Sequence, residues 1–242
     1  MSRRILTAVL LCSAVLALPA RAATNLDALN NIGGQANFRL LSEDLGAGLS
    51  YKAIIPAASM GVTGFDIGVE ASLIKLEHPA IFGNAVSGET TDTLVLPKAH
   101  VHKGLPLGFD VGAFYAAVPD SNIKLWGAEL RYALVEGGPA TPAVALRGSY
   151  SALQGVSQLK LTTTGVDVSV SKGFTLFTPY AGVGKVWVRS TPEASTGLME
   201  EDFDLNKIFV GANLNLGVVN IAVEGDKTGD TTSYGIKFGW RF

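Results

Sequence analysis

A strict two-residue period in hydrophobicity constrains this chain more than any other feature. From Phe65 to Leu73 every odd position is apolar, and every even position is glycine, serine or a carboxylate. Successive side chains of a β-strand point to opposite faces of a sheet, so one face of this segment is apolar and the other is small or charged. The same alternation recurs over 109–115, 126–134, 144–150 and 208–216. The chain is therefore predicted to be all-β.

The first 22 residues have the three parts of a secretory signal peptide. Arg3 and Arg4 precede a mainly apolar run that ends at Leu18, and Ala20-Arg21-Ala22 has the small-x-small form of a cleavage site. A membrane anchor is the alternative, but the run is shorter than the ~20 residues that a spanning helix needs. Cleavage would remove three of the 19 basic residues and the only cysteine, Cys12, so the formal net charge would fall from −2 to −5. The exported chain is expected to fold without disulfides.

Two architectures use alternating strands, a soluble barrel or sandwich with its apolar face inward and a membrane barrel with its apolar face toward lipid. The chain is 48% hydrophobic and only 17% charged, which excludes a disordered tail, and it has no basic excess that would indicate nucleic-acid binding. The second face of the strands mixes glycine, serine and asparagine with single charges, which suits a crowded barrel interior. Segments of about 10 residues also match a tilted crossing of the bilayer. The membrane barrel is favoured.

The last strand is the most specific signal. Tyr234, Ile236, Phe238, Trp240 and Phe242 alternate with small or basic residues, and Phe242 ends the sequence. In this respect the chain resembles the Gram-negative outer-membrane β-barrel proteins, whose closing strand ends in an aromatic residue. The resemblance implies a location in the cell outer membrane among lipid and lipopolysaccharide. It also implies assembly by the barrel-assembly machinery after periplasmic chaperones, with an assembly signal made by Tyr234, Phe238, Trp240 and Phe242.

Counting strands backwards from Phe242 predicts a closed antiparallel up-and-down transmembrane β-barrel of about 12 strands. The predicted strands are 36–41, 45–54, 63–76, 94–103, 108–118, 123–134, 143–152, 160–170, 178–189, 207–216, 219–224 and 232–242. Bacterial single-chain barrels use even numbers, so ten is the alternative, in which 37–45 is a small helix and one weak segment is misread. The predicted organisation is a cleaved signal peptide at 1–22, a periplasmic segment at 23–35 and the barrel at 36–242.

The polar face of these strands supplies the candidate functional residues. Either it forms a buried ion-pair network that closes a narrow barrel, or it forms the selectivity lining of a small pore. The candidate lumen-lining residues are Asp66, Glu70, Lys98, His100, His102, Asp110, Glu129, Arg131, Arg147, Lys185, Arg189, Lys237 and Arg241.

Two of these residues raise the question of metal binding. His100 and His102 lie on one face of a strand, a spacing compatible with a metal site, but two ligands are weak grounds for one and a polar lumen wall is favoured. No metal or other cofactor is expected. The sequence also lacks a Gly-x-Ser-x-Gly elbow, a His-Glu-x-x-His motif and a phosphate loop, so no enzyme is predicted.

The sequence thus predicts a monomeric integral outer-membrane barrel that acts as a narrow passive channel or as a structural surface protein. Two alternatives stay open. One is an outer-membrane hydrolase with a serine and a histidine at the barrel rim. The other is a soluble periplasmic β-barrel that binds a ligand.

Overall fold

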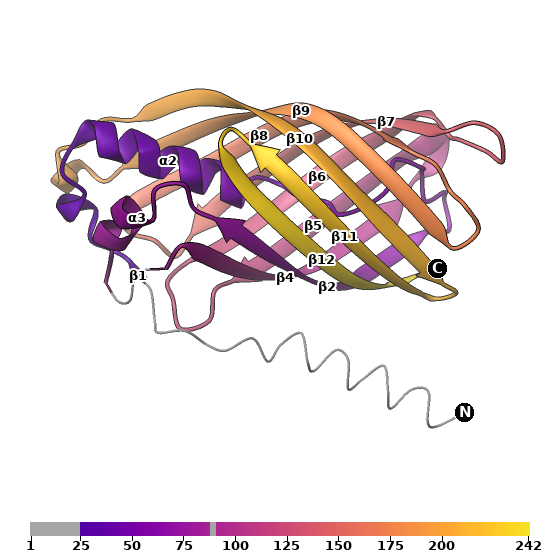
Figure 1. The fold of residues 1–242 in the computed structure, drawn as a ribbon, viewed down its shortest axis with the longest axis horizontal. Helices are drawn as coiled ribbons and strands as arrows, with labels where there is room; N and C mark the ends of the chain where they lie inside the picture. The colour runs from indigo at the N-terminus through magenta and orange to yellow at the C-terminus, as the bar shows by residue number, and fades with distance from the viewer. Residues whose placement is uncertain (1–24, 88–90) are drawn as a thin grey trace, which may run out of the picture.

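A computed structural model describes residues 25–87 and 91–242, and shows a single closed barrel (Figure 1). The predicted signal peptide lies outside the described residues. Ten strands form the barrel, each antiparallel to its neighbours, and β12 pairs with β2 to close it. The strands are β2 (Phe65–Lys75), β4 (Thr93–Gly104), β5 (Phe109–Ala117), β6 (Lys124–Val135), β7 (Ala143–Gln154), β8 (Leu159–Ser171), β9 (Phe177–Pro192), β10 (Glu201–Leu216), β11 (Val219–Thr228) and β12 (Thr231–Arg241).

Ten strands, the alternative count, is the number found, and the count of 12 is wrong. The two surplus strands were 36–41 and 45–54. Residues Gln35–Leu49 form helix α2 instead, and the barrel begins at Phe65 rather than at residue 36. The apolar residues Phe38, Leu41, Leu45 and Leu49 follow the spacing of one helix face, and all four are buried.

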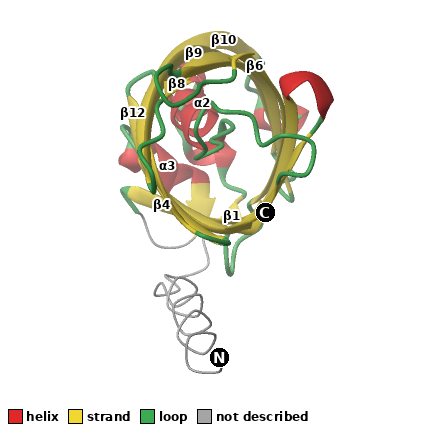
Figure 2. Ribbon diagram, turned by 90° about the vertical axis from the view of Figure 1, so that its right-hand side faces the viewer, coloured by secondary structure: helices red, strands yellow, loops and turns green. Residues whose placement is uncertain are grey.

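Residues 35–64, which precede the first barrel strand, lie inside the barrel. Strand β1 (Asn25–Leu26), the 3₁₀ turn η1 (Leu29–Asn31) and helix α3 (Pro79–Ala85) lie near one end, and β1 pairs with β3 (Val86–Ser87). Helix α2 enters the barrel from that end, and residues 50–64 continue to the other end, where β2 begins. The view along the barrel shows α2 inside the ring of strands (Figure 2).

The two ends of the barrel differ in their connections. The end that carries Phe242, here called the C-terminal rim, has connections at 105–108, 136–142, 172–176 and 217–218. The opposite end, the far rim, has the two longest connections, 76–92 and 193–200, together with 118–123, 155–158 and 229–230. Outer-membrane barrels have short periplasmic turns and longer extracellular loops, so in the predicted orientation, with Phe242 on the periplasmic side, the far rim would face outward. The sequence predicts that 23–35 shares the periplasmic side with Phe242, whereas residues 25–34 lie at the far rim.

The outer surface of the barrel carries the apolar positions of every strand. Ile67, Leu130, Val168, Ile208 and Val210 are all exposed, although a water-soluble fold would bury them. Aromatic side chains stand outward near both rims. Tyr115, Trp126, Tyr150 and Tyr234 lie toward the far rim, and Phe109, Tyr132 and Trp240 lie toward the C-terminal rim. Such belts mark the two membrane–water boundaries.

Within the described parts of the chain, no helix is both long enough and apolar enough to cross a membrane.

Candidate functional site in the barrel lumen

The lumen has two layers of different chemistry. In the far half, α2 packs in an apolar core, where its buried face meets wall residues such as Ile74, Leu96 and Val188. In these stretches the inward and outward faces of the strands are both apolar, as in a sheet that is buried on both sides. The half nearer the C-terminal rim holds charged side chains instead. The candidate site is this charged layer, together with residues 50–64 that cross it.

Buried polar contacts fix α2 to the wall and to the connection 76–92. The Ser42 hydroxyl donates to the Ser190 hydroxyl oxygen at 2.8 Å, and both residues are buried. The Asp44 carboxylate accepts from the backbone N–H of His78 at 2.8 Å and from the Thr231 hydroxyl at 3.3 Å. Because these groups are shielded from water, each bond has to be kept for the helix to stay in place.

The first charged group surrounds Asp66. Its carboxylate lies 2.8 Å from the Arg241 guanidinium, 3.1 Å from Lys237 Nζ and 3.2 Å from His100 Nε2. The other ring nitrogen of His100 lies 3.2 Å from Glu70, whose carboxylate also contacts Lys98 at 3.3 Å. Strands β2, β4 and β12 place these groups in register across the seam at which the barrel closes.

The second charged group lies across β5 to β8. Arg147 contacts the Asp167 carboxylate at 2.9 Å and Glu129 at 3.3 Å, and Glu129 lies 3.5 Å from His102 Nε2. Asp110 pairs with Arg131 at 2.8 Å. Each carboxylate named here contacts at least one cationic side chain, so the pairs neutralise one another.

Residues 50–64, here called the luminal segment, accept hydrogen bonds from cationic side chains of this layer. Arg131 donates to the backbone carbonyl of Pro56 at 2.6 Å, and Lys207 donates to that of Tyr51 at 2.8 Å. Lys52, on the segment itself, pairs with Asp226 of β11 at 2.8 Å. Cations of the wall therefore satisfy carbonyl groups that would otherwise be buried without partners.

Tyr51 sits where the two layers meet. Its ring packs against Phe114 with centroids 5.2 Å apart, and its hydroxyl lies 3.5 Å from His102 Nε2. Tyr51 is 4% exposed, so its hydroxyl is shielded from water and depends on groups of the lumen for a polar partner.

Eleven of the 13 predicted lumen-lining residues point into the barrel, ten of them buried and Arg241 with its side chain 23% exposed. Lys185 and Arg189 do not, and that part of the prediction is wrong. Their side chains are 43% and 62% exposed on the outer surface, where they pair with Asp204 and Asp202 at 2.6 and 2.8 Å. Strands β9 and β10 are 16 residues long, beyond the ~9–11 that cross a bilayer, so their ends carry outward charges past the apolar belt.

The charged layer also contains residues that are not among the predicted sites. Lys52, Tyr51 and Asp226 are buried in it. The sequence predicts a strand at 45–54 that includes Tyr51 and Lys52, and the helical spacing of the residues before them was the signal against that strand. In the described residues, no group of three or more histidine, cysteine, aspartate or glutamate side chains is arranged to hold a metal ion.

Comparisons with known proteins give structural likeness only. No family model matches the chain, and no curated protein matches it. Among solved structures, the N-terminal β-barrel domain of Pseudomonas aeruginosa OprF is 14% identical, with a TM-score of 0.38, and the match covers 75% of this chain and 99% of that one.

Two other solved structures are comparably similar. The KdgM porin is 7% identical with a TM-score of 0.38, covering 74% of this chain and 99% of that one. OprG from Pseudomonas aeruginosa is 14% identical with a TM-score of 0.36, covering 78% and 99%. The assignment to a membrane rests on the closed barrel and on the apolar belt of its outer surface. The fold is that of a membrane-spanning β-barrel.

Proposed function

We propose that this barrel is a closed structural protein of the outer membrane, whose own N-terminal segment fills its lumen, and not a passive channel. The observation that carries the proposal is the position of α2 and residues 50–64 inside the ring of strands (Figure 2). An open pore needs a continuous polar path, whereas here the far half of the lumen is an apolar core. The barrel would present its longest connections, 76–92 and 193–200, at the outer side.

A hydrolytic role has little support in the geometry. A rim hydrolase would need a histidine next to a serine at the barrel edge. His100 and His102 are instead 3% and 1% exposed inside the barrel, and their nearest partners are carboxylates and the Tyr51 hydroxyl. The proposal therefore includes no catalytic residue.

A channel gated by its plug is the second candidate. It is supported by the charged layer, because departure of α2 and the luminal segment would leave Arg131, Lys207 and Asp226 facing an aqueous path. The two candidates differ in whether α2 leaves the lumen while the barrel stays folded.

The test is single-channel conductance in planar bilayers, with the plug free or locked. The chain without its first 22 residues has no cysteine, so the double variant Ser42→Cys/Ser190→Cys introduces one pair. The two hydroxyl oxygens are 2.8 Å apart, which brings the side chains within reach of a disulfide between α2 and β9. Folding is confirmed by heat-modifiable migration, and an open porin in the same bilayer shows that the assay detects conductance.

We expect no discrete openings from the wild-type protein, and none from the double variant whether oxidised or reduced. Discrete wild-type openings would contradict the closed-barrel proposal. If oxidation of the double variant abolished such openings and reductant restored them, while the single variant Ser190→Cys conducted in both states, the plug-gated channel would replace it.

A further inference from the structure

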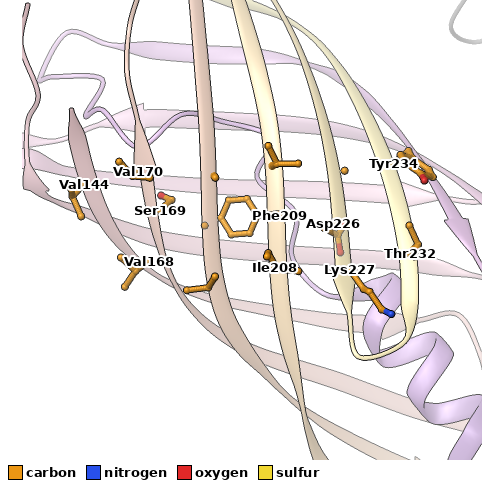
Figure 3. Close-up of a pocket in the computed structure, with 15 residues that line it drawn as sticks. Val144, Val168, Ser169, Val170, Ile208, Phe209, Asp226, Lys227, Thr232 and Tyr234 are labelled. Carbon is orange, nitrogen blue, oxygen red and sulfur yellow. The ribbon is translucent and has the colours of Figure 1, made fainter. Parts of the chain in front are cut away.

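The outer wall carries an apolar groove of about 720 Å³ across strands β7 to β12 (Figure 3). Its sides are formed by Val168, Val170, Val183, Ile208 and Val210. This volume lies within the range of pockets that hold small molecules. The groove lies on the membrane-facing surface, so whatever occupies it comes from the bilayer or from another membrane protein.

The groove is hollow because small residues form its floor. One row of paired outward positions runs from Val170 through Ala181, Val210 and Gly225 to Tyr234. Two of these five positions have little or no side chain, while their neighbours stand out from the wall. A Cβ atom built at Gly225 would meet only the Tyr234 ring, at 3.7 Å. The floor at Gly225 is therefore open space that a larger residue could fill.

The groove ends at a cationic site near the far rim. A second row of paired positions runs from Val183 through Ile208 to Lys227, then to Thr232 and to Lys75 of β2. Lys227 has an exposed side chain, and among the described residues its one ion-pair contact is Asp230 at 3.8 Å, which is 92% exposed. Lys75 is exposed and has no ion pair within the described ranges 25–87 and 91–242.

These two lysines stand at headgroup depth. Tyr234 belongs to the outward aromatic belt, and Lys227 and Lys75 lie one row farther toward the far rim. Aromatic rings of this kind sit at the boundary between acyl chains and headgroups. A lipid whose chain lies in the groove would therefore bring its headgroup to the two ammonium groups.

The outward cations of the described wall are distributed unevenly between the two rims. Six lie toward the far rim: Lys75, Lys124, Lys160, Lys185, Arg189 and Lys227. At the C-terminal rim, Lys103 and Lys172 donate to backbone carbonyl groups of neighbouring turns. Cations free to bind an anionic headgroup are therefore found on the outer-leaflet side.

We propose that this groove, here called the β7–β12 groove, binds an acyl chain of a phosphorylated glycolipid of the outer leaflet, the lipid A part of lipopolysaccharide. Lys227 and Lys75 bind its phosphate. The lysines supply the charge complementarity, and the small residues of the floor supply room for the chain. A second copy of the barrel fits less well, because two copies that met through this face would bring two hollowed walls and their lysines together. The inference holds whether the lumen is closed or gated.

The test is a native mass spectrometry titration of the folded, detergent-solubilised barrel with bis-phosphorylated hexa-acyl lipid A. We expect one saturable lipid per barrel. The variant Lys75→Ala/Lys227→Ala should weaken binding about 30-fold, because each surface lysine contributes about a factor of five to attraction of an anionic lipid. The matched control Lys124→Ala/Lys160→Ala removes two outward lysines at the same rim but outside the groove, and should bind as the wild type does.

A second pair of variants tests the acyl-chain part. Gly225→Leu fills the floor, while Gly148→Leu adds the same side chain at an outward position of β7 with nothing within 4 Å of its Cβ. Only Gly225→Leu should weaken binding, and both variants should keep heat-modifiable migration. Equal affinity of the two glycine variants would overturn the acyl-chain assignment.

Four further outcomes would overturn the rest of the proposal. If the Lys75→Ala/Lys227→Ala variant still bound lipid A tightly, the two lysines would be excluded as the phosphate site. Tight binding of dephosphorylated lipid A by the wild type would exclude it equally. Equal binding of phosphatidylglycerol would exclude selectivity for the glycolipid. Dimers of the barrel in place of lipid adducts would identify the groove as a contact between copies.

Discussion

At the scale of single residues, the stability of the interior depends on buried charged groups, some of which are the shared partner of several others. Asp66 is fully buried and is the common partner of Lys237, Arg241 and His100. A buried charge that loses its partner cannot recover the hydration it gave up on folding. The exposed pair of Lys185 and Asp204 is even shorter, at 2.6 Å, but water and salt screen it. Burial, rather than distance, decides which pair matters.

The first prediction compares these two aspartates. Asp66→Asn should lower the free energy of unfolding by about 3 to 5 kcal/mol, because it leaves buried cations without their anion. Asp204→Asn, the same chemical change at an exposed pair, should cost about 1 kcal/mol or less. Denaturant unfolding of the barrel in lipid vesicles measures both. Equal losses for the two variants would mean that water reaches Asp66.

Sequence reasoning at this scale works where the strand lies within the membrane. The polar phase of β2, β4 and β12 predicts Asp66, Glu70, Lys98 and Lys237 as luminal, and they are. It fails for Lys185 and Arg189 because their strand continues into water, where an outward charge costs nothing. Alternation identifies the face of a side chain, but not the depth at which the membrane ends.

At the scale of elements, α2 fits the lumen through its glycines. A Cβ atom at Gly46 would lie 2.7 Å from both Cγ atoms of Val188, and one at Gly48 would lie 2.7 Å from Ile74 Cγ2. Val188 is fully buried on β9, and its branched side chain has little freedom to turn aside. The glycines therefore let the helix approach the wall closely, at the expense of helix propensity.

The second prediction concerns a glycine-to-alanine substitution in α2, a change that usually stabilises a helix. Gly46→Ala should destabilise the protein, because overpacking costs about 1 to 3 kcal/mol and outweighs the roughly 1 kcal/mol gained in helix propensity. In a Val188→Ala background the clash is gone, so the same substitution should be neutral or stabilising. Unfolding midpoints of the four proteins in this double-mutant cycle give the coupling. A Gly46→Ala effect that is independent of Val188 would contradict the close packing.

The sequence contained the signal for α2, but a competing one concealed it. Phe38, Leu41, Leu45 and Leu49 recur with helical spacing. In a chain of alternating strands, however, 45–54 also fits a strand, and the even-number rule for barrels then favours a further short strand at 36–41. The pattern of residues 35–64 can predict a helix, but it does not indicate that the helix lies inside the barrel. That location depends on the strands that surround the helix. The apolar inward positions of the far half, such as Leu94 and Leu96, were a further sign of an internal core.

At the scale of the whole molecule, closure joins the end of the chain to the start of the barrel. Strand β12 pairs with β2, and the seam extends past β12, where the backbone groups of Phe242 and Phe65 bond to each other at 2.9 and 3.1 Å. The first strand of the barrel can pair on this side only when the last one is complete. The pairing of β12 with β2 also completes the ring of strands around the internal segment 35–64.

The last prediction separates the side chain of Phe242 from its backbone. Phe242→Ala keeps both seam hydrogen bonds and removes only an exposed ring, so equilibrium stability should change by no more than about 0.5 kcal/mol. If the terminal aromatic residue is read during assembly, as the resemblance implies, the appearance of the heat-modifiable form in cells should be several-fold slower. Phe177→Ala removes an exposed outward ring at the same rim from β9, and should assemble at the wild-type rate. Equal rates for the two variants would mean that Phe242 acts only through its backbone, by the two hydrogen bonds that it makes with Phe65.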